Sequence, residues 1–329
     1  MPSATGIAKT VNFRWAVIEA LSEEMERDET VFIVGEDVGG AGGTFGLTRG
    51  LRERFGEWRV KDTPLSEEGI AGLAVGAALA GMRPVLEIMF MDFITIAMEQ
   101  ICNQAAKSRT LYGGRVRVPL VVRTLAGAGL KIGGHHSASL EAWFVHTPGL
   151  KVVYPSTPAD AKGLLKTAIR DDNPVVFLEH KSLLSLKGEV PEGEHVIPLG
   201  VAEVKRAGGD CTVVATGWMV HRALAAAEEL AKAGIQLEVI DPRTLSPFDA
   251  DTVCASLEKT KRLVVVQEAP AACGFAAEVS AVVAERAIDL LDAPIRRITG
   301  APVPLPFGSL EDQLIPAVGD IVAAVREVL

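Results

Sequence analysis

The sequence has few cysteines, and they are not spaced as a metal site or a disulfide framework requires. Cys102, Cys211, Cys254 and Cys273 stand far apart. There is neither a CxxC pair nor a Cys/His spacing that would frame a zinc site. This usage predicts a reducing, cytoplasmic setting.

A hydrophobic run long enough to cross a membrane is also missing. The most apolar stretch, from Gly69 to Met82, ends at Arg83 and Pro84, short of the roughly 20 residues that a membrane span needs. The start, MPSATGIAKTVNFRWAV, lacks a charged segment followed by a long apolar run and a cleavage site. We therefore expect neither a membrane span nor a targeting peptide.

Positive charge is scarce and is not concentrated in any segment. There are 33 Lys and Arg against 42 Asp and Glu, which gives a net charge of −9. Such a chain has no cationic face to neutralise the phosphates of a nucleic acid, so no nucleic-acid partner is expected. With 48% hydrophobic and 23% charged residues, the 329 residues suffice for two globular domains.

Short apolar runs alternate with helix-length segments along the chain. Strands are predicted at 31–35, 85–89, 118–123, 151–155 and 174–179, with helices at 12–27, 68–81, 93–107 and 158–171. A polar stretch around 188–194 interrupts this rhythm, which restarts with strands at 211–216, 237–241 and 262–268 and helices at 220–233, 249–257, 274–287 and 310–328. The pattern predicts an α/β fold with parallel sheets and two domains, 1–190 and 191–329.

Ligands of open parallel sheets bind beyond the carboxyl ends of the strands, and three unusual segments are expected there. The first is the loop GGAGGTFG at 39–46, whose glycine spacing does not match the dinucleotide fingerprint; a flexible surface loop is the alternative. The second is the helix start at Glu67, where a simple capping role is the alternative. The third is the loop GAGLKIGGHHSAS at 127–139, in which an exposed histidine without function is the alternative.

The helix that follows Glu67 consists almost entirely of Gly, Ala, Val and Leu. Gly72 and Gly76 lie four residues apart on one face, where the missing side chains would let another helix approach closely. We expect that contact to bury the Glu67 end of the helix. A buried carboxylate there would need a hydrogen-bonding partner.

Several stretches resemble one family, the beta subunits of thiamine-diphosphate-dependent 2-oxo acid and acetoin dehydrogenases of the transketolase-like superfamily. They are GEDVGGAGGTFGLTRGL, DTPLSEEGIAGLAVGAALAGMRPVLEIMFMDF, QICNQAAK, HHSASLEAWFVHTPGLKVVYPSTPADAKGLL, AIRDDNPVVFLEH and LDAPIRRITG. The resemblance covers nearly the whole chain. It implies a pyrimidine-binding domain of transketolase type followed by a smaller transketolase C-terminal-type domain.

The resemblance also implies roles for individual residues. Glu67 matches the carboxylate that contacts N1′ of the aminopyrimidine and favours its imino tautomer, which activates the cofactor. Glu36 matches a second acid near this site, and Phe93 matches an aromatic that packs on the pyrimidine. His136 matches the histidine that supports proton transfer as the acyl group passes to lipoamide.

A monovalent cation such as K⁺ is implied at the family positions matched by Leu120, Ala168, Asp171 and Asn173. An ordinary helix end explains Asp171 and Asn173 nearly as well without an ion. The diphosphate and Mg²⁺ motif of the family, GDG followed by an asparagine, belongs to the alpha subunit, and no GDG occurs here. The chain is therefore expected to be active only with an alpha subunit.

The resemblance further implies an assembly of two alpha and two beta chains, beta-to-beta contact through the second domain, and docking to a lipoyl-bearing acyltransferase core. Ile96 replaces a polar residue that pyruvate-type subunits often have, and GEVPEGEHVIPLG looks more like the acetoin type; acetoin is favoured over pyruvate and branched-chain 2-oxo acids. The alternatives are a self-sufficient transketolase-like enzyme, for which 329 residues are short, a noncatalytic assembly subunit, and a flavodoxin-like electron-transfer subunit.

Overall fold

The computed structural model describes residues 8–329. The prediction that no targeting peptide is present rests partly on residues 1–7, which lie outside the described residues. The chain divides into two compact units. The first contains the described residues up to Leu125 together with His146–Glu179 and Leu183–Leu199. The second contains Ala126–Val145, His180–Ser182 and Gly200–Leu329.

The first unit is built on a sheet of strands in the order β6-β7-β5-β4-β2-β3. The pairs β2–β3, β2–β4, β4–β5 and β6–β7 are parallel. The strands are β2 (Val31–Gly35), β3 (Val60–Asp62), β4 (Arg83–Phe90), β5 (Val121–Ala126), β6 (Lys151–Val153) and β7 (Val175–His180). Their continuous apolar runs leave β2, β5 and β7 buried at every position, as expected for a sheet covered on both faces.

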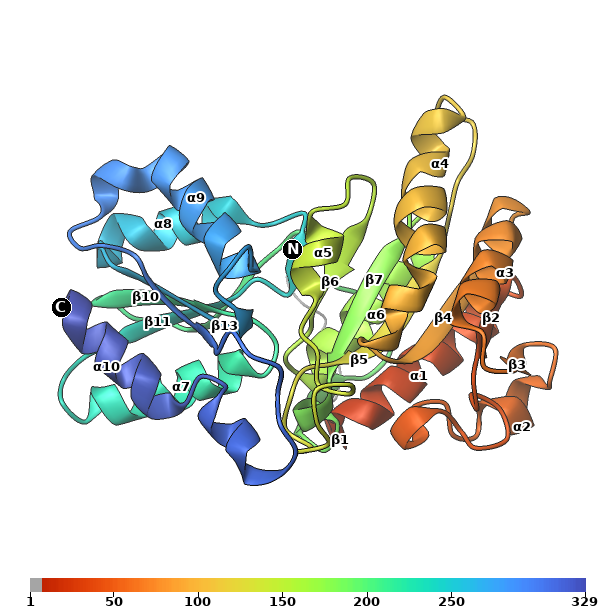
Figure 1. The fold of residues 1–329 in the computed structure, drawn as a ribbon, viewed down its shortest axis with the longest axis horizontal. Coiled ribbons are helices and arrows are strands. Elements are labelled where there is room, and N and C mark those ends of the chain that lie inside the picture. Colours follow the sequence, from red (N-terminus) through yellow and green to blue (C-terminus); the bar gives the residue numbers. More distant parts are fainter. Residues whose placement is uncertain (1–7) are drawn as a thin grey trace. The chain divides into compact units, whose positions relative to one another are not determined.

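Two short strands and several helices complete the first unit (Figure 1). Strands β1 (Ala8–Asn12) and β8 (Lys187–Pro191) form an antiparallel ribbon. The helices are α1 (Phe13–Arg27), α2 (Leu51–Phe55), α3 (Glu67–Leu79), α4 (Ala106–Leu111) and α6 (Pro158–Arg170). Helix α1 packs against α6, and α3 packs against the turns that precede α4.

The segment predicted as a helix at 93–107 is helical along its length, but it is not a regular α-helix. The chain instead forms a 3₁₀ turn, η2 (Phe93–Ala97), and a wide π-helix, η3 (Glu99–Ala105), before α4 begins. Tight and wide turns change the number of residues per turn, so the apolar positions alone do not reveal them. π-helical turns occur often at functional sites.

The second unit contains a sheet in the order β14-β13-β10-β11-β9, in which only the edge strand β9 is antiparallel. Its strands are β9 (Glu203–Arg206), β10 (Cys211–Ala215), β11 (Leu237–Asp241), β13 (Leu263–Pro270) and β14 (Arg296–Gly300), and a short strand β12 (Thr244–Ser246) follows β11. Its helices are α5 (Glu141–Val145), α7 (Met219–Ala231), α8 (Ala250–Thr260), α9 (Phe275–Ala287) and α10 (Val318–Val328). Helices α7 and α10 cover one face of the sheet, and α8 and α9 cover the other (Figure 1).

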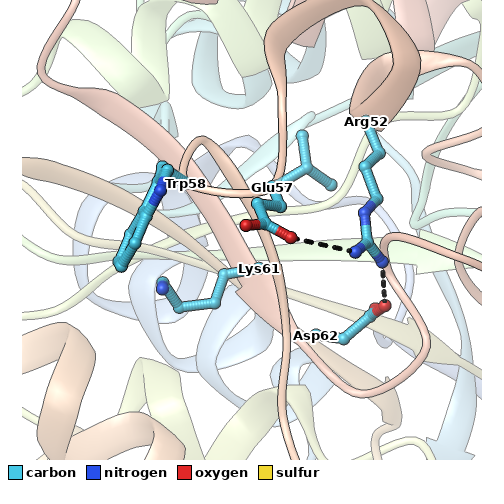
Figure 2. A pocket seen from close by; sticks show the side chains of 6 residues that line it. Arg52, Glu57, Trp58, Lys61 and Asp62 are labelled. Carbon is cyan, nitrogen blue, oxygen red and sulfur yellow. Dashed lines mark hydrogen bonds and ion pairs between the residues drawn. The ribbon is translucent and has the colours of Figure 1, made fainter.

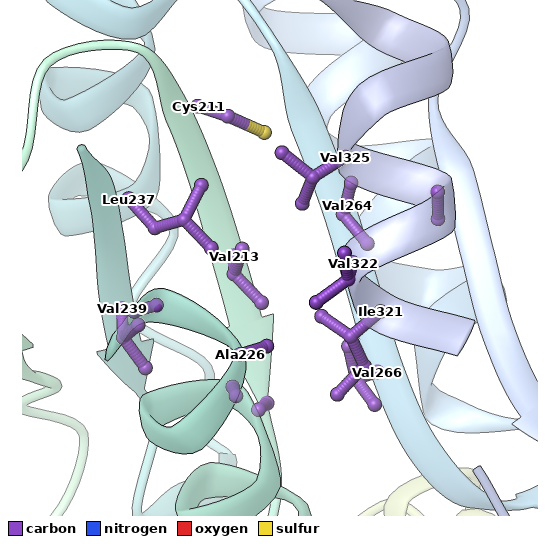
Figure 3. Packing of buried hydrophobic residues seen from close by; sticks show 14 of the residues in the cluster. Cys211, Val213, Ala226, Leu237, Val239, Val264, Val266, Ile321, Val322 and Val325 are labelled. Carbon is purple, nitrogen blue, oxygen red and sulfur yellow. The ribbon is translucent and has the colours of Figure 1, made fainter. Parts of the chain in front are cut away.

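A valine-rich core holds α10 to this sheet. Val213, Val264 and Val266 of the strands meet Ile321 and Val325 of the helix (Figure 3). The prediction of one helix at 310–328 is wrong, because the chain forms a 3₁₀ segment, η6 (Gly308–Gln313), and then restarts as α10 after Pro316, which lacks the amide that a continuous helix needs.

The predicted α/β class with mainly parallel sheets is confirmed in both units. No helix within residues 8–329 combines the length and the apolarity that a membrane crossing would need.

Candidate active site

The carboxyl ends of three parallel strands bring functional residues of the first unit to one edge of its sheet. Glu36 follows β2, Asp62 ends β3 and Phe90 ends β4. The register places Gly35 opposite both Asp62 and Glu87. Since ligands of parallel sheets bind beyond this edge, it is the candidate active site.

Glu36 and Glu67 form a pair of neighbouring carboxylates at this edge. Glu36 is buried, and its Oε1 accepts a hydrogen bond from the Ser66 amide at 3.3 Å, directly before α3 begins at Glu67. Burial, together with the negative charge of Glu67, raises the pKa of Glu36 above its usual value. The protonated form of Glu36 is therefore favoured more than it is in water.

The capping alternative for Glu67 is only partly supported. Glu67 does open α3, where the helix dipole favours a carboxylate, but the Ser66 side chain makes no capping hydrogen bond. The expected burial of this end is not formed within the single chain, in which Glu67 is half-buried and Glu68 is exposed; burial by another subunit stays a prediction. Within residues 8–329 no hydrogen bond or ion pair engages the Glu67 carboxylate, which leaves it accessible to a ligand.

Three phenylalanine rings, from the segment after β2, the end of β4 and the turn after it, form an edge-to-face series. The centroids of Phe45 and Phe90 are 6.2 Å apart, and those of Phe90 and Phe93 are 5.9 Å apart, with nearly perpendicular planes. Phe45 and Asp37 both have positive φ angles, 54° and 56°, a conformation that costs energy outside glycine and concentrates at functional sites. The flat, aromatic-lined setting suits a planar heterocycle.

The glycine-rich loop at 39–46 is held in place rather than free. Its Gly39 and Gly40 amides donate to the Asp62 carboxylate at 2.5 and 3.0 Å, and its Thr44 amide donates to Glu87 Oε1 at 3.1 Å. A Cβ on Gly43 would lie 2.5 Å from Thr48 Oγ1. These contacts contradict the alternative of a flexible surface loop.

A buried triad of charged residues supports this loop through Glu87. The Arg123 guanidinium pairs with Glu179 through two bonds of 2.7 and 3.1 Å and with Glu87 Oε2 at 3.1 Å. All three residues are at most 5% exposed, and burial raises the pKa of Glu87. Sequence reasoning missed this triad, although each member is a charged residue inside an apolar strand, which was a usable signal.

A surface pocket of about 180 Å³ lies next to the loop. Figure 2 shows Arg52 between Glu57 and Asp62, at 3.6 and 2.8 Å, and the Lys61 ammonium faces the Trp58 ring 4.3 Å from its centroid. None of the predicted site residues lines this pocket. Its relation to the site is indirect, through Asp62, which also binds the glycine-rich loop.

The predicted histidine lies in the second unit. His135 is exposed and His136 is half-buried, so the two neighbours differ as expected for adjacent residues. The His136 carbonyl accepts a hydrogen bond from the Lys181 ammonium, and its amide donates to Gly133 O at 3.1 Å. The structure therefore brings Glu36, Glu67 and Phe93 together in one unit and places His136 in the other.

The loop that carries His136 lies against a second buried polar cluster that sequence reasoning missed. His180 Nε2 is 3.0 Å from Glu268 Oε2, and the Ser182 amide donates to His180 Nδ1 at 3.1 Å, which makes Nε2 the donor to Glu268. Glu141 lies nearby, and its Oε2 is buried with no hydrogen-bond partner in the described part of the chain. Burial and the neighbouring Glu268 charge raise the pKa of Glu141 to about 7.

The four residues predicted to bind a monovalent cation already make protein contacts. The Leu120 carbonyl accepts from the Val175 amide at 2.8 Å, and the Ala168 carbonyl accepts from the Asp171 amide at 3.3 Å. The Asp171 carboxylate receives the Asn173 amide at 2.9 Å and pairs with a lysine. These contacts support the helix-end alternative, yet each carbonyl has a second lone pair, so the cation site stays a prediction. No group of three or more His, Cys, Asp or Glu is placed to hold a metal ion within residues 8–329.

The glycine face of α3 is largely open. A Cβ on Gly72 would meet the Gln100 side chain at 3.5 Å, whereas one on Gly76 would meet nothing within 4 Å. Leu73 and Leu79 of the same helix are 48% and 40% exposed. Within residues 8–329 neither glycine makes the tight helix contact that was expected, since Gly72 meets a side chain only at ordinary van der Waals distance.

Known proteins match the chain over nearly its whole length. The family model for the transketolase pyrimidine-binding domain matches residues 9–187, and that for the transketolase C-terminal domain matches residues 200–321. Among solved structures, a split gene transketolase described as an inactive beta4 tetramer superposes with a TM-score of 0.80 at 25% identity and covers 98% of each chain.

Curated relatives are considerably closer in sequence. The beta subunit of acetoin:2,6-dichlorophenolindophenol oxidoreductase from Cupriavidus necator is 49% identical and covers 98% of each chain. From Bacillus subtilis, the beta subunit of the pyruvate dehydrogenase E1 component is 49% identical over 95% of this chain and 97% of the relative. The beta subunit of 2-oxoisovalerate dehydrogenase from the same organism is 47% identical over 95% and 96%. The chain therefore belongs to the transketolase-like family that contains the beta subunits of acetoin, pyruvate and 2-oxoisovalerate dehydrogenases.

Proposed function

We propose that this chain is the beta subunit of a thiamine-diphosphate-dependent dehydrogenase component. It cleaves acetoin or a 2-oxo acid and passes the acyl group to the lipoamide of an acyltransferase. The observation that carries the proposal is the Glu36–Glu67 pair. Two acids follow adjacent parallel strands, one of them has a raised pKa, and a series of aromatic rings lies in or after strands of the same sheet.

The donor set fits the aminopyrimidine of thiamine diphosphate. Glu67 is accessible and would accept a hydrogen bond from a protonated ring nitrogen, and Phe93 would pack on the flat ring. When bound, the cofactor supplies a carbon nucleophile that adds to the substrate carbonyl. Burial favours the protonated form of Glu36. A protonated Glu36 would not repel the negative charge of Glu67, and it would keep a proton near that carboxylate.

His136 is proposed to deliver a proton during transfer to lipoamide. Its imidazole suits that task because histidine exchanges protons near neutral pH. The main chain on either side of His136 is fixed by hydrogen bonds to Gly133 and Lys181. A fixed backbone is what a proton donor needs in order to act at a defined point.

The proposal includes an alpha partner in an assembly of two alpha and two beta chains. The sequence has no GDG motif, so Mg²⁺ and the diphosphate would be held by the alpha chain. The open glycine face of α3, with its exposed Leu73 and Leu79, is the proposed contact with another subunit. Contact between beta chains through the second domain, docking of the acyltransferase core, a K⁺ ion and a cytoplasmic location complete the proposal.

Acetoin is the proposed substrate in preference to pyruvate and branched-chain 2-oxo acids. Ile96 is 52% exposed at the start of the helical segment that follows the site, where its apolar side chain would favour a substrate without a carboxylate. Assays of the alpha–beta complex with acetoin, pyruvate and branched-chain 2-oxo acids test this choice. A higher kcat/KM for pyruvate than for acetoin would reverse it.

The test of the function is Glu67→Gln in the complex with the alpha chain. The neutral amide cannot favour the same ring tautomer, so turnover should fall about a hundredfold to ten-thousandfold. Glu68→Gln is the matched control, because Glu68 is the exposed neighbour in the same helical turn and should leave turnover unchanged. Near-normal turnover of Glu67→Gln would contradict a catalytic role and favour an assembly subunit.

The partnership is tested by calorimetric titration with thiamine diphosphate and Mg²⁺. The purified chain alone should show negligible binding, and tight binding should appear only after co-expression with the alpha chain. Stoichiometric micromolar binding by the chain alone would favour a self-sufficient transketolase-like enzyme instead.

A further inference from the structure

The loop at 127–139, here called the histidine loop, has an irregular backbone. Gly127, Gly129 and Gly133 have positive φ angles, and so does Lys131 at 61°, where a side chain makes that conformation costly. Within the loop, the Gly127 amide donates to Ala138 O at 2.9 Å and closes the base, and the His136 amide donates to Gly133 O at 3.1 Å. The amides of Gly129 and Lys131 receive their support from outside the loop.

Glu311 of η6 supplies much of that support. Its Oε1 accepts the Gly129 amide at 2.7 Å and the Lys131 amide at 3.2 Å. Its Oε2 lies 3.5 Å from the hydroxyl of Ser137, the residue that follows His136, which is a weak bond at this length. Glu311 is fully buried, so these charge-assisted bonds are shielded from water.

Glu268 of β13 holds the two ends of the loop in the same manner. Its Oε1 accepts the Ala128 amide at 2.6 Å and the Ser139 hydroxyl at 3.2 Å, and its Oε2 is fixed by His180. Burial alone would raise the pKa of Glu268, but these bonds lower it, which keeps the acceptor charged. The histidine loop is thus held at its base by one carboxylate and along its span by another.

We infer that Glu311 is a positioning residue for His136. It fixes the main chain before the histidine through the Gly129 and Lys131 amides and contacts the Ser137 hydroxyl after it, and thereby sets where the imidazole delivers its proton. This inference rests on the proposed function, which assigns proton transfer to His136. Because Glu311 is fully buried, it acts through the loop and not by contact with substrate or cofactor.

The test uses Glu311→Asp in the alpha–beta complex. Aspartate keeps the charge but withdraws the carboxylate by one C–C bond, about 1.5 Å, so it cannot reach both amides from the same backbone. Glu311→Gln is the conservative variant, because its carbonyl oxygen can still accept both amides. Asp312→Asn is the matched control: Asp312 contacts the same loop, but through an exposed ion pair with Lys131 at 2.7 Å.

Two assays separate the steps of the reaction. An artificial electron acceptor reports the step on the substrate, and lipoamide reports acyl transfer. Glu311→Asp should lower kcat for transfer on the order of a hundredfold, the effect of a misplacement of about 1 Å, with KM and the dye assay within about twofold of wild type. Glu311→Gln should transfer faster than Glu311→Asp but several-fold more slowly than wild type, because its neutral oxygen makes weaker hydrogen bonds, and Asp312→Asn should equal wild type.

The double variant His136→Ala/Glu311→Asp decides whether Glu311 acts through the histidine. If it does, the double variant should transfer no more slowly than His136→Ala alone. Multiplied losses, or normal transfer in Glu311→Asp beside a selective loss in His136→Ala, would overturn this inference alone. If His136→Ala itself transfers normally, the role proposed for His136 fails and this inference fails with it. If Glu311→Asp does not assemble, the same cycle is run with Glu311→Gln. This variant should transfer more slowly than Asp312→Asn and reduce the dye normally. Equal transfer rates in the two variants would overturn the inference.

Discussion

The glycine-rich loop at 39–46 and the histidine loop at 127–139 are anchored by the same chemistry at different sequence distances. Each follows a parallel strand, and each has main-chain amides that donate to carboxylates. The anchors of the glycine-rich loop, Asp62 and Glu87, lie 23 and 43 residues from the amides they accept. Those of the histidine loop, Glu268 and Glu311, lie 140 and 182 residues away.

The difference shows that proximity to a strand does not decide which unit orders a loop. The histidine loop directly continues β5 of the first unit, yet its contacts assign it to the second. The glycine-rich loop depends on neighbouring strands of its own sheet. Damage to the first unit should therefore disturb the carboxylate pair, and damage to the second should disturb the histidine.

The largest loss of stability is expected at the buried triad that supports the glycine-rich loop. Arg123→Met removes the only cation of the Glu87–Arg123–Glu179 triad and leaves two buried carboxylates unpaired, which should lower the free energy of unfolding by about 3 to 5 kcal/mol. Arg117→Met is the control, since Arg117 is 71% exposed and pairs with Asp172 at 3.2 Å; it should cost less than about 1 kcal/mol. Urea unfolding measures both, and equal losses would contradict the role of the triad.

The base of the histidine loop should be nearly as sensitive. A Cβ on Gly127 would lie 2.2 Å from His180 Nε2, and the backbone there has a φ of 82°. Gly127→Ala should cost roughly 3 kcal/mol from overpacking and strain together. Gly113 also has a positive φ, 61°, but a Cβ there would meet nothing within 4 Å. Gly113→Ala therefore measures the backbone strain alone, and its loss of stability should be smaller. The two unfolding midpoints, measured side by side, separate these causes.

The stability of the second unit should depend on pH through Glu141. The pKa of Glu141 is raised from 4.5 to about 7, so between these values the folded chain holds a proton that the unfolded chain releases. Stability from this group is therefore present below about pH 4.5 and is lost as pH rises to about 7. Glu141→Gln cannot ionise, and its advantage over wild type should grow across this window to roughly 3 kcal/mol.

Unfolding of Glu141→Gln and wild type at pH 5, 6, 7 and 8 measures that trend. Glu278→Gln, a change at an exposed position on α9, should follow wild type at every pH. A constant difference between Glu141→Gln and wild type would show that Glu141 is not the titrating group.

The smallest effect is expected inside the glycine-rich loop itself. A Cβ on Gly46 would lie 3.4 Å from Arg49 Nη2, at the far end of a flexible side chain, and φ is 77°. Gly46→Ala should cost about 1 to 2 kcal/mol, mostly from the backbone. Gly50→Ala, with a φ of 81° and open space, should cost nearly the same; a much larger loss in Gly46→Ala would show that Arg49 cannot move.

The buried strands could be predicted because their apolar runs are continuous. The runs at 31–35 and 237–241 coincide with β2 and β11. Polar or three-residue strands such as β1, β3 and β8 carry no such signal. The segment at 93–107 has helical spacing, but the change from a 3₁₀ turn to a π-helix leaves no trace in apolar periodicity.

The sequence allowed the site residues to be predicted, but not the residues far along the chain that hold them in place. Glu36 and Glu67 were predicted from a family resemblance, and the structure places both at one sheet edge; their catalytic roles stay predictions. Glu87, Arg123 and Glu179 stood out as charges within apolar strands and could have been recognised. Nothing near Glu311 in the sequence indicates Gly129 as its partner, because tertiary folding alone brings them together.

The distance between Glu311 and Gly129 also has a consequence for biosynthesis. A ribosome adds about 5 to 20 residues per second, so the amide of Gly129 emerges roughly 10 to 40 s before the carboxylate that it binds. During that interval the nascent first unit can form its own sheet and glycine-rich loop, while the amides of Ala128, Gly129 and Lys131 lack the carboxylates of Glu268 and Glu311. The histidine loop is thus among the last parts of the polypeptide to become ordered, and an interrupted translation product would carry one ordered loop and one without support.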